Sequence, residues 1–352
     1  MACAILLAAL SLGVVRPAGA EEPTAAAPPA SRRWEVHAQT GLQYDSNVGI
    51  APGGQAIPVD PADPAAGRTG ARADGAITLG AGGSVDVVDS DRAQLNLGYD
   101  LYQTLHFQLE NYDLRSNRVQ ATGGFALLPQ LWLGAQTGFE HYVFGSDAYS
   151  REPFLAPFVS YLQGNWGLTQ LLYRHGYTSY LQQPFEGIRN GPTDIVTLSQ
   201  TFYWGARYAT VGYEFGSERP RNSQGSENAQ CLQIAADTEP GQPRPLCPGD
   251  YRFHYNQAYV GIGFTPGWRT TFDVMYLFRH ENYTQDNSLT VGPGSQPFKR
   301  RDDINQVQVG VRRPIGQYFS VGLNYFGTFD NSNISFYTYD RHIVSAEVRF
   351  AY

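Results

Sequence analysis

The sequence of 352 residues has little of several residue types that mark other classes of protein. It contains one lysine, Lys299, together with two methionines and three cysteines, and no run of basic residues suits nucleic acid. No apolar run after residue 20 approaches the roughly 20 residues that a transmembrane helix needs. The mean hydropathy of -0.34 is that of a polar chain. These features argue against a helical membrane protein and against a nucleic-acid-binding protein.

Glycine and aromatic residues are abundant instead, with 38 Gly, 23 Tyr and 19 Phe, which suits many strands joined by tight turns. The last stretch of the chain shows the pattern clearly, because every second residue from Val344 to Tyr352 is apolar. These apolar positions are Val344, Ala346, Val348, Phe350 and Tyr352. Side chains alternate across a strand, so such a segment has one apolar face. Hydropathy scales do not detect a sheet of this kind, because the residues between the apolar positions are polar.

The same alternation recurs along the chain and predicts about fourteen strands. The predicted strands are residues 34–44, 73–87, 93–106, 114–127, 131–144, 153–162, 168–179, 194–203, 208–216, 252–264, 269–280, 303–312, 318–329 and 339–352. The segment 153–162 fits least well, since Pro157 cannot donate to a strand ladder. An even number of strands is typical of single-chain bacterial barrels.

The connections between these segments alternate in length. Short ones centre on residues 89–91, 128–130, 164–165, 205–206, 265–267 and 314–316. The others run near residues 45–72, 107–113, 145–152, 180–193, 217–251, 281–302 and 330–338. Outer-membrane barrels have short periplasmic turns and longer external loops, whereas a sandwich has no reason to keep this alternation. We therefore predict one all-β domain over residues 34–352, a closed antiparallel up-and-down transmembrane β-barrel.

The N-terminal region predicts an exported protein. Residues 4–15 form an apolar run, and Ala18-Gly19-Ala20 is an A-x-A cleavage site. This pattern predicts a signal peptide over residues 1–20, removed after export. Together with the predicted barrel, it predicts a location in the Gram-negative outer membrane. Residues 21–33 are rich in proline and alanine, which predicts a flexible periplasmic lead-in.

Aromatic residues sort by the type of connection. Tryptophan and tyrosine favour the membrane–water interface because one edge is apolar and the other forms hydrogen bonds. We expect a girdle near the short turns, formed by Trp34, Trp132, Trp166, Trp204, Trp268, Tyr318, Phe350 and Tyr352. We expect the opposite girdle to contain Tyr44, Tyr112, Tyr177, Tyr180, Tyr251 and Tyr283.

Charged residues fall on the face opposite to the apolar one and are therefore expected to line the pore. They are Glu35, Asp74, Asp86, Asp100, Arg118, Glu140, Arg174, Glu214, Asp273, Arg279, Arg312, Glu347 and Arg349. Because both signs occur, no strong ion selectivity is predicted. Most of these charges are expected to pair across neighbouring strands. Glu35 and Arg349 lie on the first and last strands and are predicted to pair across the seam.

Little else in the sequence suggests chemistry. Cys231 and Cys247 lie in one polar stretch of an exported chain, which predicts a loop disulfide. A lipid hydrolase would need a nucleophile and a base on one outward face. His141, His175 and His280 fall on that face, but no histidine has Ser or Thr two residues later. The alternative of a nucleophile on a neighbouring strand stays open, because the sequence does not give the strand register. We expect no catalytic residue, no metal and no cofactor.

Two segments resemble known barrel proteins. The C-terminal strand ending on Phe350 and Tyr352 resembles the strand by which Gram-negative outer-membrane barrels are recognised for assembly. The segment from Gly41 to Val48 (GLQYDSNV) resembles the first strand and turn of the barrel module in surface-lipoprotein-assembly-modifier proteins. Related openings occur in barrels encoded with exopolysaccharide export systems. The modifier family carries a helical repeat domain before its barrel, for which residues 21–33 are too short.

The resemblance implies outer-membrane lipid, the barrel-assembly machinery and possible secretion or export machinery as partners. From the signal peptide, the strand parity, the alternating connection lengths and the sorting of the tryptophans, we expect a non-catalytic pore or conduit for a solute or polymer. Two alternatives stand beside this expectation: a polysaccharide-export barrel, and a plugged structural or binding barrel that acts through its external loops.

Overall fold

The structure is a computed structural model that describes residues 33–49, 72–183, 185–239, 244–266, 269–292 and 296–352. The predicted signal peptide, all but the last residue of the predicted lead-in, and Trp268 lie outside the described residues.

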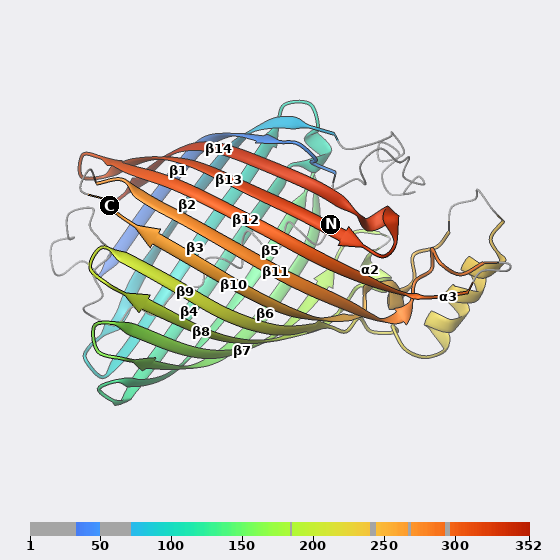
Figure 1. Cartoon of the computed structure of the whole chain (residues 1–352), viewed down its shortest axis with the longest axis horizontal. Coiled ribbons are helices and arrows are strands. Elements are labelled where there is room, and N and C mark those ends of the chain that lie inside the picture. Colours follow the sequence, from blue (N-terminus) through green and yellow to red (C-terminus); the bar gives the residue numbers. More distant parts are fainter. Residues whose placement is uncertain (1–32, 50–71, 184, 240–243, 267–268, 293–295) are drawn as a thin grey trace.

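Fourteen strands follow one another around a closed antiparallel barrel (Figure 1). They are β1 (Trp34–Asp45), β2 (Asp74–Asp89), β3 (Ala93–His106), β4 (Leu114–Leu128), β5 (Leu131–Phe144), β6 (Asp147–Leu162), β7 (Gly167–Tyr180), β8 (Gly191–Tyr203), β9 (Arg207–Glu218), β10 (Phe253–Phe264), β11 (Thr271–Asp286), β12 (Lys299–Ile315), β13 (Phe319–Ser332) and β14 (Tyr339–Ala351). Each strand pairs with its neighbours in sequence, so the predicted fold class is confirmed.

The barrel closes where the first and last strands meet. Leu42 lies opposite Ala346 and Tyr44 opposite Val344. Beyond this ladder, the Tyr352 N–H donates to the Val36 carbonyl oxygen at 2.9 Å. Closure leaves no row of unpaired N–H and C=O groups at a sheet edge, which is the condition for a sheet to sit in lipid.

The connections are short at one end of the barrel and longer at the other (Figure 1). We call the first the turn end, which also holds the C-terminus, and the second the loop end. At the turn end, Gly205 and Gly316 have φ values of +65° and +73°, a left-handed conformation that glycine adopts at low cost.

One predicted loop is wrong. Residues 145–152 form a tight turn followed directly by β6, which begins at Asp147. Pro153 and Pro157 of β6 face outward, and pairing with β7 is interrupted at both, because proline has no N–H to donate. The sequence prediction began this strand at Pro153 and therefore missed its first six residues.

The loop end carries the helical elements, namely α2 (Phe185–Ile188), α3 (Ser226–Asp237) and the 3-10 turns η2 (Glu110–Tyr112), η3 (Pro248–Tyr251) and η4 (Ser335–Tyr337). The predicted Cys231–Cys247 disulfide is present, with a Cα–Cα distance of 5.7 Å. It ties α3, which projects beyond the barrel in Figure 1, to the segment that ends in η3. No helix within the described residues is long and apolar enough to cross a membrane.

Candidate functional site

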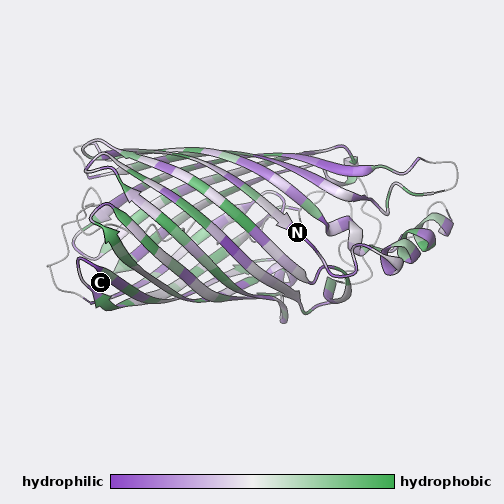
Figure 2. Cartoon of the chain, turned by 90° about the horizontal axis from the view of Figure 1, so that it is seen from below, coloured by the Kyte–Doolittle hydropathy of each residue, from purple (hydrophilic) through white to green (hydrophobic). Residues whose placement is uncertain are grey.

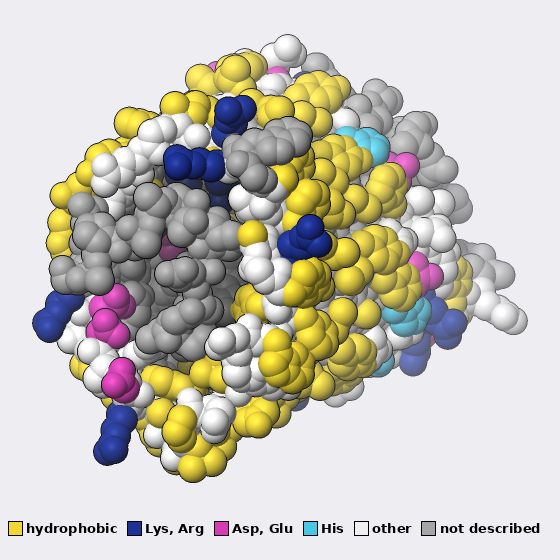
Figure 3. All heavy atoms as spheres, turned by 60° about the vertical axis from the view of Figure 1, so that its left-hand side comes forward, with side chains coloured by type: hydrophobic (Ala, Val, Ile, Leu, Met, Phe, Trp, Pro, Cys, Tyr) yellow, Lys and Arg dark blue, Asp and Glu magenta, His cyan; other side chains and the backbone are white. Residues whose placement is uncertain are grey.

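The two faces of the barrel wall differ in chemistry. On β13, Phe319, Val321 and Leu323 point outward and are exposed, whereas Gly322 between them is buried. Hydrophobic side chains cover the outer wall in Figure 3, and Figure 2 shows the strands becoming more hydrophilic toward the loop end. The outer surface is therefore an apolar band, and the inner face collects the polar residues.

Aromatic residues border the band at the turn end. Trp34, Trp166, Trp204 and Tyr352 are exposed on the outside. The Trp34 and Tyr352 ring centroids lie 5.2 Å apart. Tyr318 contacts both Phe350 and Tyr352, at 6.1 Å and 5.4 Å. These predicted members therefore lie on the outer face at the turn end, and the membrane girdle itself stays a prediction.

Trp132 does not belong to this girdle. Its side chain is 8% exposed and shares the inner face with Glu140 and Tyr142, and it lies opposite the buried Ser160. The prediction rested on closeness to a turn. Counting in twos from the inward Glu140 would have placed Trp132 inside the barrel.

A second aromatic row borders the band at the loop end, and sequence reasoning missed it. Its members are outward tyrosines whose hydroxyls each bond to a polar side chain on the next strand. The pairs are Tyr99–Asn117, Tyr173–Asp194, Tyr213–Asn256, Tyr276–Asn305 and Tyr325–His342. A ring in the apolar band with its hydroxyl in the polar zone is the arrangement expected at an interface.

The predicted second girdle is only partly correct. Tyr44 is exposed on the outside, but Tyr180 and Tyr283 are buried at the loop end. Tyr251 packs edge-on against Phe185, with centroids 6.2 Å apart. Tyr180 of β7 and Tyr283 of β11 lie on the inward parity of their strands, so counting in twos would have placed them inside. Tyr251 lies in η3, where strand periodicity gives no information.

The charged residues predicted for the pore all lie on inward positions of their strands. Several pair across strands: Asp100 with His37 at 3.2 Å, Asp273 with the Tyr208 hydroxyl at 2.7 Å, and Arg312 with Glu347 at 3.9 Å. Five other predicted positions, Arg118, Glu140, Arg174, Glu214 and Arg279, belong to two clusters of charged side chains.

Two of these predictions need correction. Asp74 is buried at the loop end, where its carboxylate accepts from the backbone N–H groups of Gln108 and Leu109. The predicted pair between Glu35 and Arg349 is not formed, because Arg349 lies opposite Gln39, four residues from Glu35. Only the register between β1 and β14 could show that Glu35 and Arg349 do not face each other.

The first charge cluster comprises Arg118, Glu140, Glu152 and Arg174 on β4 to β7. Nη2 of Arg174 lies 2.9 Å from Glu152 Oε1 and 3.4 Å from Glu140 Oε1. Nε of Arg118 lies 3.5 Å from Glu140 Oε1. The Arg174 guanidinium also covers the Phe154 ring at 4.2 Å from its centroid. Glu152 was missed because residues 145–152 were interpreted as a loop.

The second charge cluster comprises Glu214, Tyr255, Arg279 and Glu281 on β9 to β11. Arg279 Nε lies 2.8 Å from Glu281 Oε1, and its guanidinium lies 3.6 Å from the Tyr255 centroid. The Tyr255 hydroxyl donates to Glu214 Oε1 at 2.6 Å. Glu281 was missed because β11 continues to Asp286, beyond the predicted strand end. Both clusters combine buried ions of opposite sign on the inner wall.

Inner-face aromatic rings lie against glycines on the neighbouring strand. An added Cβ at Gly212 would come within 2.1 Å of Tyr259, at Gly216 within 2.2 Å of Tyr255, and at Gly263 within 2.1 Å of Tyr208. Each glycine is the direct ladder partner of its aromatic residue. Gly134–Phe158 and Gly138–Phe154 repeat the arrangement between β5 and β6. The rings therefore occupy the space over glycine backbone along the wall.

We expect a substitution of Gly212 by alanine to push the Tyr259 ring away from the wall. A methyl group there collides with the ring, and overpacking of this kind costs roughly 1–3 kcal/mol. In conductance measurements the variant should pass less current than the unmodified protein. Gly261→Ala is the matched control, because its Cβ meets nothing closer than 3.8 Å. Equal conductance of all three proteins would contradict this account of the rings.

A cap of side chains closes part of the loop end, formed by Tyr149, Tyr180, Phe185, Arg189 and Tyr251. The Arg189 guanidinium lies 4.6 Å from the ring centroids of both Tyr180 and Tyr251. Burial acts to lower the pKa of Arg189, but the neighbouring tyrosines and Glu218 raise it above its usual range. Arg189 is thus a buried permanent cation that contacts aromatic rings from β7, α2 and η3.

The comparisons with known proteins give likeness in fold only. No known family model matches the chain, and no curated protein matches its sequence. The chain is similar to a loop-deletion form of OmpT, an outer-membrane protein of Vibrio cholerae, at 8% identity over 91% of this chain and 98% of that one, with a TM-score of 0.46. It is similar to an anion-selective porin from Comamonas acidovorans, at 9% identity over 91% and 98% of the two chains, with a TM-score of 0.46. The resemblance of residues 41–48 to assembly-modifier proteins is not confirmed.

The three outward histidines lie near the loop end. His175 Nδ1 is 2.8 Å from Asp194 Oδ1, and His280 Nδ1 is 2.6 Å from Asp303 Oδ1. His141 lies between Asn117 and Arg151 in the strand register. Among the residues that the structure describes, none of these three rings bonds to a serine or threonine hydroxyl. The described part therefore shows His–Asp pairs without an adjacent hydroxyl nucleophile.

Proposed function

We propose that the chain is a non-catalytic pore or conduit in the Gram-negative outer membrane. The observation that carries the proposal is the difference between the two faces of one closed wall. Outside, an apolar band lies between two aromatic rows; inside, charges of both signs are paired. Backbone groups cannot remain unpaired in lipid, so only a closed sheet can cross it with strands.

Three inner-wall features support passage of a polar solute. Fourteen strands lie between the small filled barrels and the 16–18-strand porins with aqueous channels. Rings held over glycines take up less of the interior than rings that project inward. The two charge clusters place paired charges of both signs on the inner wall, which suits a polar rather than an apolar solute.

Planar-bilayer recording tests this function. Purified, folded protein should insert and give discrete current steps that scale with salt concentration. A protein whose fold is verified by circular dichroism and by heat-modifiable mobility but which passes no current would reject the pore. That result would favour the plugged barrel that acts through its loops.

A polysaccharide conduit is the second candidate, and a row of tyrosines favours it. Tyr255, Tyr259 and Tyr208 lie along the paired strands β9 and β10, with Tyr208 opposite Gly263. The three positions are four ladder steps apart, roughly 13 Å at strand spacing. A tyrosine ring offers an apolar face and a polar hydroxyl, a combination that suits sugar rings. Concentration-dependent current block by a neutral oligosaccharide, lost in Tyr259→Ala, is the expected result; no block would reject this candidate.

A further inference from the structure

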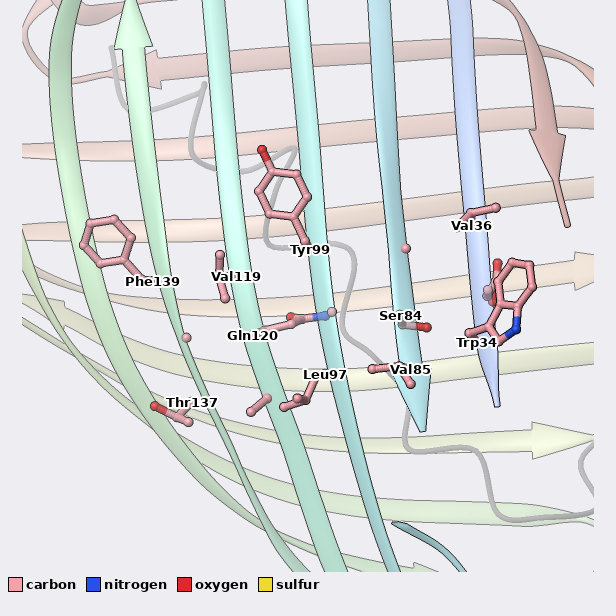
Figure 4. A pocket seen from close by; sticks show the side chains of 15 residues that line it. Trp34, Val36, Ser84, Val85, Leu97, Tyr99, Val119, Gln120, Thr137 and Phe139 are labelled. Atoms are coloured by element: carbon pink, nitrogen blue, oxygen red, sulfur yellow. The ribbon is translucent and has the colours of Figure 1, made fainter. Parts of the chain in front are cut away.

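An apolar groove runs over the outer face between β1 and β5. It is a cavity of about 600 Å³. Leu97, Tyr99, Val119 and Phe139 contribute exposed walls, and the small side chain of Ala121 leaves the groove open between them. Figure 4 shows these larger side chains on neighbouring strands. Such a groove on the lipid-facing surface has the shape and chemistry to hold an acyl chain.

A cationic patch lies directly beyond the groove toward the loop end, formed by Arg115, His141 and Arg151. His141 is the ladder partner of both Asn117 and Arg151. The side chains of Asn117, His141 and Arg151 therefore form a row across β4, β5 and β6. Arg115 is the next outward residue on β4 after Asn117. Both arginines are exposed, and neither forms an ion pair with a described residue.

A second, smaller cavity adjoins this patch. Its volume is about 200 Å³, and Gln103, Arg115, Val143 and Asp113 are among its lining residues. The Asp113 carboxylate accepts from the backbone N–H of His106 at 2.6 Å and lies 3.1 Å from its ring Nδ1. The cavity is therefore lined by the Arg115 side chain and by a carboxylate whose contacts are made to His106.

The depth of the patch fits a lipid headgroup. Along β4, Val119, Asn117 and Arg115 follow one another on the outward face at roughly 7 Å per step. Asn117 accepts from the Tyr99 hydroxyl, which belongs to the interfacial tyrosine row. Val119 thus lies in the apolar band, Asn117 at its border and Arg115 just beyond it.

Two other sectors of the same rim carry acids beside their cations. Asp194 pairs with both His175 and Arg219, and Asp303 pairs with His280. The β4–β6 sector differs, because its outward arginines have no carboxylate partner within the described part of the chain. An anionic ligand is the natural complement to this sector.

We infer that the outer face of β1 to β6 binds a phosphorylated lipid of the outer leaflet. Its phosphate contacts Arg115 and Arg151, with His141 between them, and one acyl chain fills the groove below. Arginine is suited to phosphate because its planar guanidinium can donate two parallel hydrogen bonds. This inference rests on the proposed membrane location but does not depend on the barrel being an open pore.

The test uses the full chain purified in detergent and native mass spectrometry with three probes. The probes are bisphosphorylated lipid A, the same lipid without its phosphates, and inorganic phosphate. The unmodified protein should retain one bisphosphorylated lipid, and R115Q/R151Q should bind it about 100-fold or more weakly, because two charge-assisted contacts are lost and each contributes about tenfold or more to the affinity. R301Q is the matched control, because Arg301 is an exposed outward arginine on β12. It should bind like the unmodified protein.

A second variant tests the groove separately. Ala121→Trp fills it without touching the charges and should also weaken lipid binding, while leaving the barrel's heat-modifiable mobility unchanged. Equal binding of dephosphorylated lipid, or of inorganic phosphate alone, would overturn the proposal. So would a dimer in place of a lipid adduct, because the groove would then be an interface between copies. Bilayer conductance of R115Q/R151Q should match the unmodified protein, which separates failure of this site from failure of the pore.

Discussion

Replacing Arg174 by alanine should destabilise the barrel by about 3–5 kcal/mol, the usual cost of removing one partner from a buried ion pair. Arg174 lies between Glu140 and Glu152, both of which are buried. Without it, two carboxylates share one site with only Arg118 near Glu140. The free energy of unfolding, measured by urea titration in lipid vesicles, should fall accordingly.

The same substitution should change ion selectivity. The first charge cluster is balanced, with two arginines and two glutamates, and the variant has one excess negative charge facing the interior. Reversal potentials in a salt gradient should therefore shift toward cation preference.

Arg312→Ala is the matched control for Arg174. Arg312 is also inward, but its side chain is 48% exposed and lies 3.9 Å from Glu347. Exposed pairs contribute at most about 1 kcal/mol. Similar destabilisation by both substitutions would contradict the view that the first cluster is a tightly packed ionic element.

Replacing Arg189 by alanine should open the cap at the loop end. The guanidinium covers the Tyr180 and Tyr251 rings and lies 3.7 Å from Glu218 Oε2. Desolvated cation–π contacts contribute about 2 kcal/mol or more each. The variant also leaves Glu218 without its nearest cation. We expect faster proteolysis of the segment between β7 and β8, and larger current steps because the mouth is less obstructed.

Arg221→Ala provides the comparison. Its guanidinium lies 5.1 Å from the centroid of Tyr177, which is on the outward face. An unchanged protease pattern and unchanged current in Arg189→Ala, indistinguishable from Arg221→Ala, would show that the cap does not depend on its buried cation.

The fold was predictable because membrane closure imposes simple rules on the sequence. Alternation along β14 and β3, together with alternating connection lengths, fixed the strand number and the direction of each face. Inward charges such as Arg174 and Arg279 followed from parity alone. The prediction began β6 six residues late, at Pro153, and the strand accommodates Pro153 and Pro157 where its ladder with β7 is interrupted.

The finer arrangement depends on register and on loop packing. Parity alone cannot tell that Arg174 contacts both Glu140 and Glu152 from two different strands. Tyr180 and Tyr251 were predicted for the opposite girdle because tyrosine favours the membrane–water interface, but they lie against Arg189 in a buried cap. Trp132 is a different case, since its inward position was available from the sequence and closeness to a turn was the weaker signal.

Site-directed spin labelling along β13 in lipid vesicles tests the central claim most directly, namely lipid outside and water inside one closed wall. Labels at Val321, Leu323 and Tyr325 should collide mainly with oxygen, and labels at Ser320, Gly322 and Asn324 mainly with a water-soluble nickel complex. The two accessibilities should alternate with a period of two residues and opposite phase. Equal oxygen accessibility on both faces, or protection of both faces from both reagents, would contradict the account.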